Sequence, residues 1–339
     1  MNKKILIISN DKIFIDNDKI SSDYNDTINI IEGLAKKKHL SFVCKNAKKI
    51  RNFVTIKNKY RKFKKKNFFN FKDNFNNYKI FMISITPFNL FALIFIKIFN
   101  RKIRGYVYLR SDGHKEYLYK YGLLGHIFYD LMFKIVTNFL KIVAVSRHLS
   151  GLKENYTLIK PSEIENEWFL KRKKADLHKP KLLYLGRYKK EKGVFSLINI
   201  FDSINFNFEL NIVGLKKKIT SPNDKVKLFN EVNSTKKIIS FYDKCNIFVL
   251  PSYTEGAPKV IFESLARYRP IIVFEEIKHV RENFRGIFVC RRQTKDFINK
   301  VRYIMKNYKY IIKEIKKNKI YTKKQFQNEL SELFNENFK

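Results

Sequence analysis

Hydrophobic and polar positions alternate along this chain in short blocks, which fall into two series. Apolar runs of a few residues predict strands, and the amphipathic stretches between them predict helices. The first series predicts strands at 5–8, 40–44, 80–85, 105–109 and 142–145, and helices at 25–37, 88–99 and 117–140. Strands that alternate with helices indicate a parallel sheet covered on both faces.

The second series begins after a polar, proline-marked stretch at 160–180. It predicts strands at 181–185, 209–213, 247–250, 270–274 and 286–290, and helices at 194–202 and 258–266, followed by lysine-rich helical segments to Lys339. Both halves are therefore predicted to be parallel α/β units. In such sheets ligands lie at the carboxyl ends of the strands, and two facing sheets leave a cleft between them.

One apolar segment, 80–99, has about the length of a membrane span. Its polar residues argue against a span, and we interpret it as a buried strand, a turn at Thr86-Pro87 and an apolar helix. The apolar run Ile5–Ile8 is too short for a signal peptide. The stretch 45–79, rich in Lys, Asn and Phe, is interpreted as a solvated face or loop rather than a recognition patch.

Composition excludes several classes of protein. The chain has 339 residues and a net charge of +39, yet 45% of its residues are hydrophobic and 15% aromatic, which a disordered basic tail would not have. Its 3 Cys are far apart, so a disulfide scaffold and a zinc ribbon are excluded and a reducing compartment is indicated. The positive charge is mostly Lys and attracts polyanions, but charge alone does not choose between nucleic acid, lipid headgroups and phosphorylated substrates.

Chemistry is concentrated after the strand that ends at Leu250. A polar turn carries Glu255 and Gly256, a helix is predicted to begin near Pro258, and Glu263 lies further along it. The first N–H groups of a helix and the positive end of its dipole form an anion site. Two carboxylates beside such a site suit a sugar nucleotide, although helix capping and a solvated Glu263 are the alternative interpretation.

A second group of residues follows the strand that ends at Leu185. Gly186 would let a ligand approach the backbone, and Arg187 could hold phosphate oxygens in a bidentate fashion. A following Lys, such as Lys192 before Gly193, would act as a point charge. This group favours the sugar-nucleotide interpretation of the first.

With both groups in view, the sequence resembles the retaining glycosyltransferases of family 4, which have the GT-B fold and belong to the glycosyl transferases group 1. The resemblance covers most of 181–289. It rests on Gly-Arg…Lys-Gly, on Leu-Pro-Ser after a strand, and on Glu-Gly…Pro with a second Glu eight positions after the first. It implies two facing Rossmann-like domains with a cleft between them: an acceptor domain at 1–165, a donor domain at 166–310, and a helical segment at 311–339 that could pack back on the first.

The resemblance also implies site residues. Arg187 and Lys192 would bind the donor diphosphate, Glu255 would lie near the donor sugar as a catalytic residue, and Glu263 would bind the ribose. The remaining donor-binding positions are Gly186, Gly256, Ala257 and Pro258. No metal and no cofactor would be needed, because the departing diphosphate would be stabilised electrostatically.

Three segments depart from the family pattern. Where the family has a glycine-rich loop, 10–27 contains five Asp and no Gly. Where many members have a His-Asp pair, the chain has Arg110, Asp112 and His114; we take Arg110 as an acceptor-side candidate and the other two as catalytic candidates, with a structural turn as the alternative. Finally, Phe274-Glu-Glu-Ile replaces the usual small residues.

The leading hypothesis is transfer of a sugar from a nucleotide-diphosphate sugar to a glycan or lipid-linked acceptor of a cell-surface polysaccharide or lipopolysaccharide. Such an enzyme would be cytoplasmic and peripheral at the inner face of the membrane, where basic residues meet anionic lipid. A non-catalytic nucleic-acid-binding protein is the alternative from another class, although no recognisable nucleic-acid motif supports it. A GT-B phosphorylase or epimerase is the third possibility.

Overall fold

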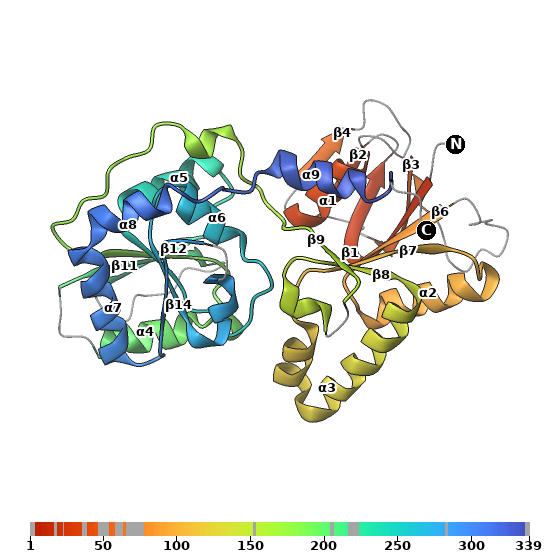
Figure 1. The fold of residues 1–339 in the computed structure, drawn as a ribbon, viewed down its shortest axis with the longest axis horizontal. Helices are drawn as coiled ribbons and strands as arrows, with labels where there is room; N and C mark the ends of the chain where they lie inside the picture. Colours follow the sequence, from red (N-terminus) through yellow and green to blue (C-terminus); the bar gives the residue numbers. More distant parts are fainter. Residues whose placement is uncertain are drawn as a thin grey trace. The chain divides into compact units, whose positions relative to one another are not determined.

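The computed structural model describes residues 4–16, 19–22, 24–35, 39–46, 54–57, 64–65, 78–151, 154–203, 207–215, 224–281 and 284–335. The chain divides into two compact units, each with its own sheet (Figure 1). The first unit contains residues 1–163 and 322–339, and the second contains 164–321. The sequence-based division at 165/166 and 310/311 differs from this one by two residues at the first boundary and eleven at the second.

The first unit is built on a sheet whose central strands are parallel. It contains β1 (Lys4–Asp16), β2 (Lys19–Ser22), β3 (His39–Asn46), β4 (Val54–Lys57), β5 (Lys64–Lys65), β6 (Tyr78–Ile83), β7 (Arg104–Leu109), β8 (Lys141–Ala144) and β9 (Tyr156–Leu158). The parallel strands are ordered β5-β3-β1-β6-β7-β8-β9. Apolar residues on β1 and β6, among them Ile7 and Phe81, are fully buried, which explains why the hydrophobic pattern predicted these strands.

The predicted parallel sheet is present in the first unit, with an antiparallel extension that the sequence did not indicate. Strand β1 continues past its apolar run and pairs with β2 in antiparallel register, and β2 pairs with β4 in the same way. The described part of 10–27 is thus largely a hairpin rather than a loop. Lys19–Ser22 has one large apolar residue, Ile20, so no apolar run marked β2 in the sequence.

Helices cover both faces of the first sheet. Helix α1 (Asn25–Ala35) packs on β2 and β3, whereas α2 (Pro87–Phe99) packs on β1 and α3 (Gly113–Phe139) on β7 and β8. Because parallel crossovers are right-handed, the two helices that connect β6, β7 and β8 lie on the face opposite α1. Figure 1 shows this arrangement, with α2 and α3 on one side of the sheet and α1 on the other.

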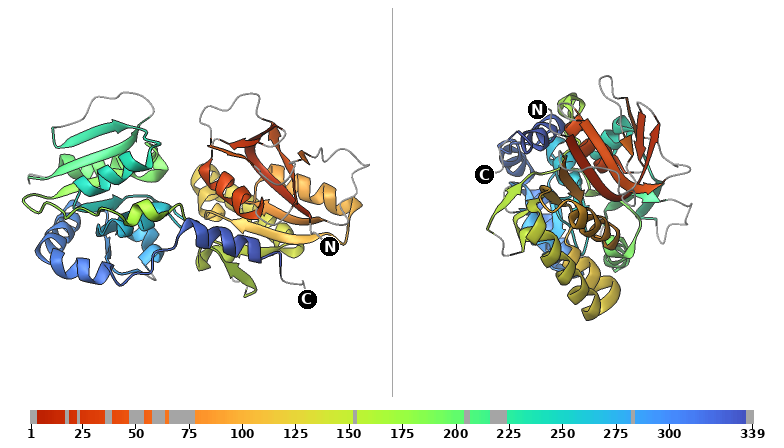
Figure 2. Two further views of the ribbon diagram at one scale, coloured as in Figure 1. Left: turned by 90° about the horizontal axis from the view of Figure 1, so that it is seen from above. Right: turned by 90° about the vertical axis from the view of Figure 1, so that its right-hand side faces the viewer.

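The C-terminal helix α9 (Lys323–Glu332) belongs to the first unit and packs along α1. Gln327 Nε2 donates to Glu32 Oε2 at 2.7 Å, and Lys323 pairs with the same carboxylate at 3.1 Å. After the helix, Tyr106 donates its hydroxyl to the Leu333 carbonyl at 3.0 Å. In Figure 2 the dark blue α9 lies with the red and orange elements of this unit.

The second unit has an all-parallel six-stranded sheet. Its strands are β10 (Lys181–Leu185), β11 (Glu209–Leu215), β12 (Val226–Asn230), β13 (Ile247–Leu250), β14 (Ile271–Phe274) and β15 (Ile287–Cys290), in the order β12-β11-β10-β13-β14-β15. The helices are α4 (Val194–Asp202), α5 (Thr235–Lys244), α6 (Lys259–Ala266), α7 (Thr294–Lys306) and α8 (Tyr308–Ile315). This is a doubly wound α/β topology, in which the strand order reverses between β10 and β13.

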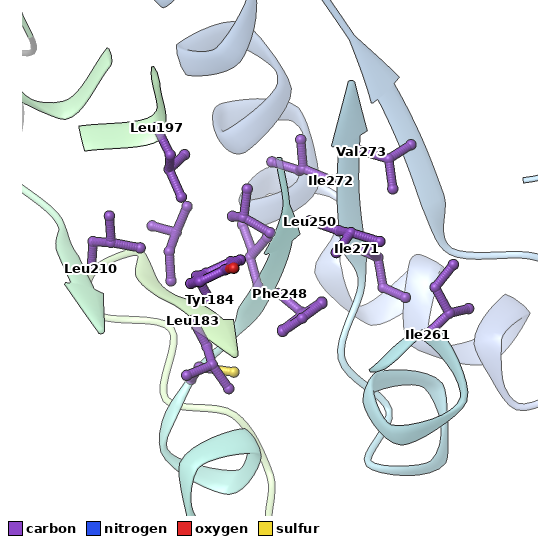
Figure 3. Close-up of a cluster of buried hydrophobic side chains, with 14 of the residues drawn as sticks. Leu183, Tyr184, Leu197, Leu210, Phe248, Leu250, Ile261, Ile271, Ile272 and Val273 are labelled. Atoms are coloured by element: carbon purple, nitrogen blue, oxygen red, sulfur yellow. The ribbon is translucent and has the colours of Figure 1, made fainter. Parts of the chain in front are cut away.

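The core of the second unit lies between this sheet and its helices (Figure 3). Phe248, Ile271 and Ile272 contribute fully buried side chains from the central strands, and Leu197 and Ile261 contribute side chains from α4 and α6. Each buried aliphatic or aromatic side chain stabilises the folded state by roughly 1.5–3 kcal/mol. The strand ends that carry the candidate residues are therefore held in place by a dense apolar layer.

A buried ion pair fixes the segment that leads into the second unit. Arg267 is fully buried and binds Asp243 through Nε at 3.0 Å and Nη2 at 2.8 Å. The same guanidinium donates to the carbonyls of Trp168, Leu170 and Lys171. Every donor of this arginine is thus satisfied, which is the condition for burying such a charge.

The prediction that 80–99 is a strand, a turn and a helix is confirmed. Strand β6 ends at Ile83, and Thr86 caps α2 by accepting from the Asn89 N–H at 3.2 Å. None of the helices in the described ranges combines the length and the apolarity that a membrane crossing requires. Most of 45–79 lies outside the described residues; within it the structure gives the end of β3, β4, β5 and the start of β6.

Candidate functional site

The candidate site lies where the strand order of the second sheet reverses. The loop after β10 runs through Gly186 and Arg187 to Gly193, and the loop after β13 runs from Pro251 to Pro258. Strands β10 and β13 are parallel neighbours, so both loops leave the same edge of the sheet. At such a reversal the helices diverge to opposite faces, and the strand ends are left accessible to a ligand.

Gly193 allows the two loops to approach each other closely. Its φ of +68° is in the left-handed region, and a Cβ added there would lie 1.8 Å from the Pro251 carbonyl oxygen. The loops are also joined by a backbone hydrogen bond from Tyr253 N–H to the Glu191 carbonyl at 3.2 Å. Only glycine satisfies both the backbone conformation and the contact.

An ion pair joins the two loops at their centre. Lys192 Nζ lies 2.7 Å from Glu255 Oε1, and Ser252 Oγ donates to the same oxygen at 2.7 Å. The side chains of Lys192 and Glu255 are only 20% and 13% exposed, so solvent screens the pair weakly. The Glu255 carboxylate is therefore held in one orientation by two donors.

Tyr184 lies on β10, directly before the loop that carries Arg187. Burial raises the pKa of Tyr184, and the negative charge of Glu255 raises it further. The hydroxyl is therefore neutral at physiological pH and acts as a donor, to the Arg187 carbonyl at 2.8 Å. Tyr184 thus fixes the backbone at Arg187. The Arg187 side chain is exposed, and within the described ranges no carboxylate forms an ion pair with it.

Two residues that sequence reasoning missed support the Pro251–Pro258 loop. Arg292 donates to the Pro251 carbonyl at 3.0 Å and to Ser196 Oγ at 2.7 Å, and its guanidinium stacks on Tyr253 with 4.1 Å between the charged carbon and the ring centroid. His279 Nε2 lies 3.1 Å from the Glu255 carbonyl oxygen. His279 follows β14 and Arg292 follows β15, but neither belongs to the two motifs that indicated the site, so only the fold brings them to it.

Glu263 is on α6 and its side chain points into the protein. The residue is 8% exposed, and Tyr242 donates its hydroxyl to Oε2 at 2.9 Å. Burial raises the pKa of Tyr242, and the Glu263 carboxylate raises it further. The alternative interpretation of Glu263 as a solvated residue is therefore wrong. Nothing in the sequence indicated Tyr242 as its partner, because the two are 21 positions apart.

Helix α6 begins one residue later than predicted. Pro258 is the N-cap, with φ −70° and ψ 121°, and Lys259 is the first helical residue. Gly256 is buried and Ala257 is half-buried beside it. The segment that carries these three residues lies between Glu255 and the positive end of the helix dipole.

The first unit has a second cluster at its own strand ends. Arg110, directly after β7, donates to Ser84 Oγ at 3.1 Å and to Thr27 Oγ1 at 3.3 Å, and pairs with Asp11 at 3.3 Å. Thr27 also donates to Asp11. Asp11 reaches the cluster because the register of β1 against β3 shifts between Ser9 and Lys12, a bulge that redirects its side chain.

Asp112 and His114 lie apart from this cluster, in contacts that stabilise α3. Asp112 is the N-cap and accepts from the Lys115 N–H at 3.1 Å. The His114 ring packs against Tyr129 at 4.7 Å and Phe133 at 5.2 Å, measured between centroids. Burial lowers the pKa of His114 below its ordinary 6.5, more than the Asp112 charge raises it. These contacts fit the structural alternative; a catalytic role for either residue stays a prediction.

The donor set of the site consists of cations, hydroxyls and helix N–H groups. Within the described ranges, no three or more His, Cys, Asp or Glu side chains are placed so that they could share a metal ion. Arg187 and Lys192 can supply hydrogen bonds and electrostatic stabilisation to an anion.

With the geometry established, comparison with known proteins is informative. Residues 166–325 match the family model of the glycosyl transferases group 1. The resemblance to group 1 is confirmed over this segment. It covers all but the first two residues of the second unit and therefore both loops of the candidate site.

The capsular polysaccharide biosynthesis glycosyltransferase CapM of Staphylococcus aureus is 32% identical to this chain over 99 residues, which cover 26% of each protein. The matched segment thus spans only about a quarter of the length of curated relatives such as CapM.

Similarity to solved structures extends over the whole chain. A sucrose-phosphate synthase from Thermosynechococcus elongatus has a TM-score of 0.69 at 13% identity and covers 98% of both chains. HepE of Anabaena, solved in complex with UDP-glucose, has a TM-score of 0.66 at 10% identity and covers 98% of this chain and 100% of that one. At these identities the likeness shows the fold, and the predicted GT-B fold class is confirmed.

Proposed function

We propose that this protein is a retaining, metal-independent glycosyltransferase. It would transfer a hexose from a nucleotide-diphosphate sugar to a glycan or lipid-linked acceptor in cell-surface polysaccharide synthesis. The observation that carries the proposal is the Lys192–Glu255–Ser252 arrangement at the strand-order reversal of a group 1 segment. The curated relative CapM, which is named for capsular polysaccharide biosynthesis, supports the product class.

The donor diphosphate would lie between Arg187 and the start of α6. Breaking the bond between the sugar C1 and the phosphate oxygen leaves negative charge on the diphosphate. Cations and helix N–H groups that face this charge stabilise the transition state more than the ground state. Lys192 has three N–H donors, so it can retain Glu255 and still donate to a phosphate oxygen.

Glu255 and Glu263 would recognise hydroxyl groups. Glu255 is oriented by Lys192 and Ser252, and its remaining lone pairs can accept from a hydroxyl of the donor sugar. Glu263 is oriented by Tyr242 and can accept from the ribose in the same way. A carboxylate whose orientation is fixed before the ligand binds loses less entropy on binding.

Donor binding is tested first by thermal unfolding with a panel of UDP-, GDP- and ADP-sugars. A ligand that binds only the folded state stabilises it, by about 2.7 kcal/mol at a hundredfold excess over Kd. We expect one nucleotide class to raise Tm, and Arg187→Ala and Glu263→Ala to reduce the increase. Lys190→Ala, an exposed lysine of the same loop, is the matched control.

Product analysis then separates the candidate reactions. Transfer with retained anomeric configuration would support the proposal, whereas inverted products would contradict the retaining mechanism. A phosphorylase would need inorganic phosphate, and an epimerase would return an isomeric sugar nucleotide. Failure of every sugar nucleotide to raise Tm would contradict the proposal as a whole.

A further inference from the structure

Helix α2 carries large apolar side chains on its outer face as well as on its inner face. The inner face buries Leu93 and Ile96, but Phe91 and Ile98 on the outer face are 73% and 61% exposed. A helix that is hydrophobic all round is normally buried on all sides. The exposed fractions show that no described residue covers the outer face of α2.

Helix α3 is a helical hairpin with an apolar tip. At Gly122 the backbone leaves the helical conformation, with φ +65° and ψ −157°, and the chain reverses. Ring contacts hold the two halves together, Tyr117 against Tyr129 at 5.1 Å and His114 against Phe133 at 5.2 Å. Figure 1 shows the two halves meeting at a point that extends away from the sheet.

The residues around this point are apolar and exposed. Tyr121, Leu123 and Leu124 are 66%, 68% and 81% exposed. Ile127 and Leu131 continue from Leu124 at helical spacing and are 56% and 55% exposed. An uncovered apolar stripe of this kind is found at sites of protein or membrane contact.

The two helices are neighbours. They lie on the same face of the first sheet, and Lys97 of α2 is 5.0 Å from the ring centroid of Phe139 at the end of α3. We call their outward apolar residues the α2/α3 surface. Its members are Phe91, Ile98, Tyr121, Leu123, Leu124, Ile127 and Leu131.

Charge at the border of the α2/α3 surface is positive. No Asp or Glu occurs in 78–111, whereas Arg101, Lys102 and Arg104 follow α2 and are exposed. The exposed lysines of α3 are each within 4 Å of a carboxylate, so the hairpin itself is nearly neutral. A neutral apolar tip that contains Tyr and Leu is suited to the lipid interface of a bilayer. The basic segment beside it is suited to anionic headgroups.

The same charges argue against a second copy of the chain as the occupant. A twofold contact brings identical patches together, so the basic border of one copy would meet that of the other. A net charge of +39 on each chain opposes the association further. Anionic lipid has the opposite sign, so the exposed Lys and Arg side chains at the border attract it.

We infer that the α2/α3 surface is a membrane-docking surface. The tip of the α3 hairpin inserts into the lipid interface, and the basic segment after α2 contacts anionic headgroups. This inference rests on the proposed function, because the docking surface would bring the enzyme to a lipid-linked acceptor. The residues that contact lipid would be those of the α2/α3 surface.

The test is flotation of the full chain with vesicles of phosphatidylcholine, with and without phosphatidylglycerol. We expect binding to the anionic vesicles. The double variant Leu123→Glu with Leu124→Glu should bind at least about tenfold more weakly, because two apolar side chains that would be buried in lipid become charged. The matched control is Leu170→Glu in the second unit, at a leucine that is 62% exposed, which should bind as the wild type does.

Three results would overturn the inference: no binding to either vesicle, equal binding by wild type and double variant, or a wild-type dimer that the double variant converts to monomer. Unchanged Tm increases with sugar nucleotide would show that the double variant is folded. Loss of vesicle binding with retained donor binding keeps the proposed function separate from the docking surface. Vesicle binding by a protein that binds no donor would contradict only the proposed function.

Discussion

The two units of this protein place similar polar clusters at the same position of similar sheets, and the clusters differ in how they are built. In both sheets the parallel strands follow one order, with a reversal between β1 and β6 in the first and between β10 and β13 in the second. Lys192–Glu255 lies at the second reversal and Arg110–Asp11 at the first. The same sheet topology therefore produces an accessible set of strand ends in each unit.

The difference lies in what each pair has left to offer a ligand. Arg110 uses donors on Ser84, Thr27 and Asp11, so its guanidinium is largely committed to the protein. Lys192 contacts one carboxylate oxygen, and Arg187 beside it is exposed. We therefore expect the second cluster to bind the charged donor and the first to maintain its sheet edge and recognise the acceptor.

The largest effect is expected for Lys192→Met. Removing a cation that faces developing negative charge should lower the transfer rate by about 10²–10³-fold. Steady-state kinetics with the donor identified by thermal unfolding measures this, with Lys190→Met as the matched control. A variant that keeps more than a tenth of wild-type activity would mean that Lys192 serves the loop and not the reaction.

Arg110→Met should act on stability and leave donor affinity unchanged. Asp11, whose side chain is 14% exposed, would lose its cation, and the variant should be less stable by about 1–3 kcal/mol. Urea unfolding measures the stability, and the Tm increase with donor measures the affinity. A smaller Tm increase with donor in this variant would contradict the expectation that only the second cluster binds the donor.

Arg292→Lys tests whether support of the Pro251–Pro258 loop matters for the second cluster. Lysine keeps the charge but loses the planar group that binds Pro251 and Ser196 and stacks on Tyr253, so donor affinity should fall about tenfold. Titration by thermal unfolding gives the affinity. Arg291→Lys, at an exposed neighbouring arginine, is the control and should leave affinity unchanged.

The smallest effect is a pH dependence at His114. Because burial lowers its pKa in the folded state, the unfolded chain binds a proton near pH 6.5 that the folded protein does not. Its contribution to stability is therefore full above pH 6.5 and declines as pH falls toward the folded pKa. His114→Gln should lose less stability than wild type between pH 7 and 5 in parallel unfolding curves. Identical losses would mean that His114 does not contribute to the pH dependence.

The sequence predicted those elements that a short run of neighbouring residues defines. Strands β10 and β13 and helix α4 were predicted with the bounds they have, because each is an apolar block between polar turns. Helix α5 was not predicted, since Thr235–Lys244 buries only Tyr242. The reversal of α3 was not predicted either, because a single Gly122 within a helical pattern is usually tolerated.

The site was predictable only as far as its residues belong to the motifs that follow β10 and β13. Glu255 and Lys192 each follow a strand, and the motif spacing placed them together in the hypothesis. Tyr242 and Arg292 are distant along the chain and meet the site through packing of α5 and of the segment after β15. Whether the predicted residues act as proposed stays a prediction until the kinetic experiments are done.

The return of the chain to the first unit has a consequence for biosynthesis. Helix α9, which covers α1, is encoded after the whole second unit, so the ribosome must deliver residues 164–321 before the first unit can be completed. Domains usually fold as units in the order of their synthesis. Here the later unit can finish folding first, while α1 lacks its contacts with α9 until residues 323–332 have emerged.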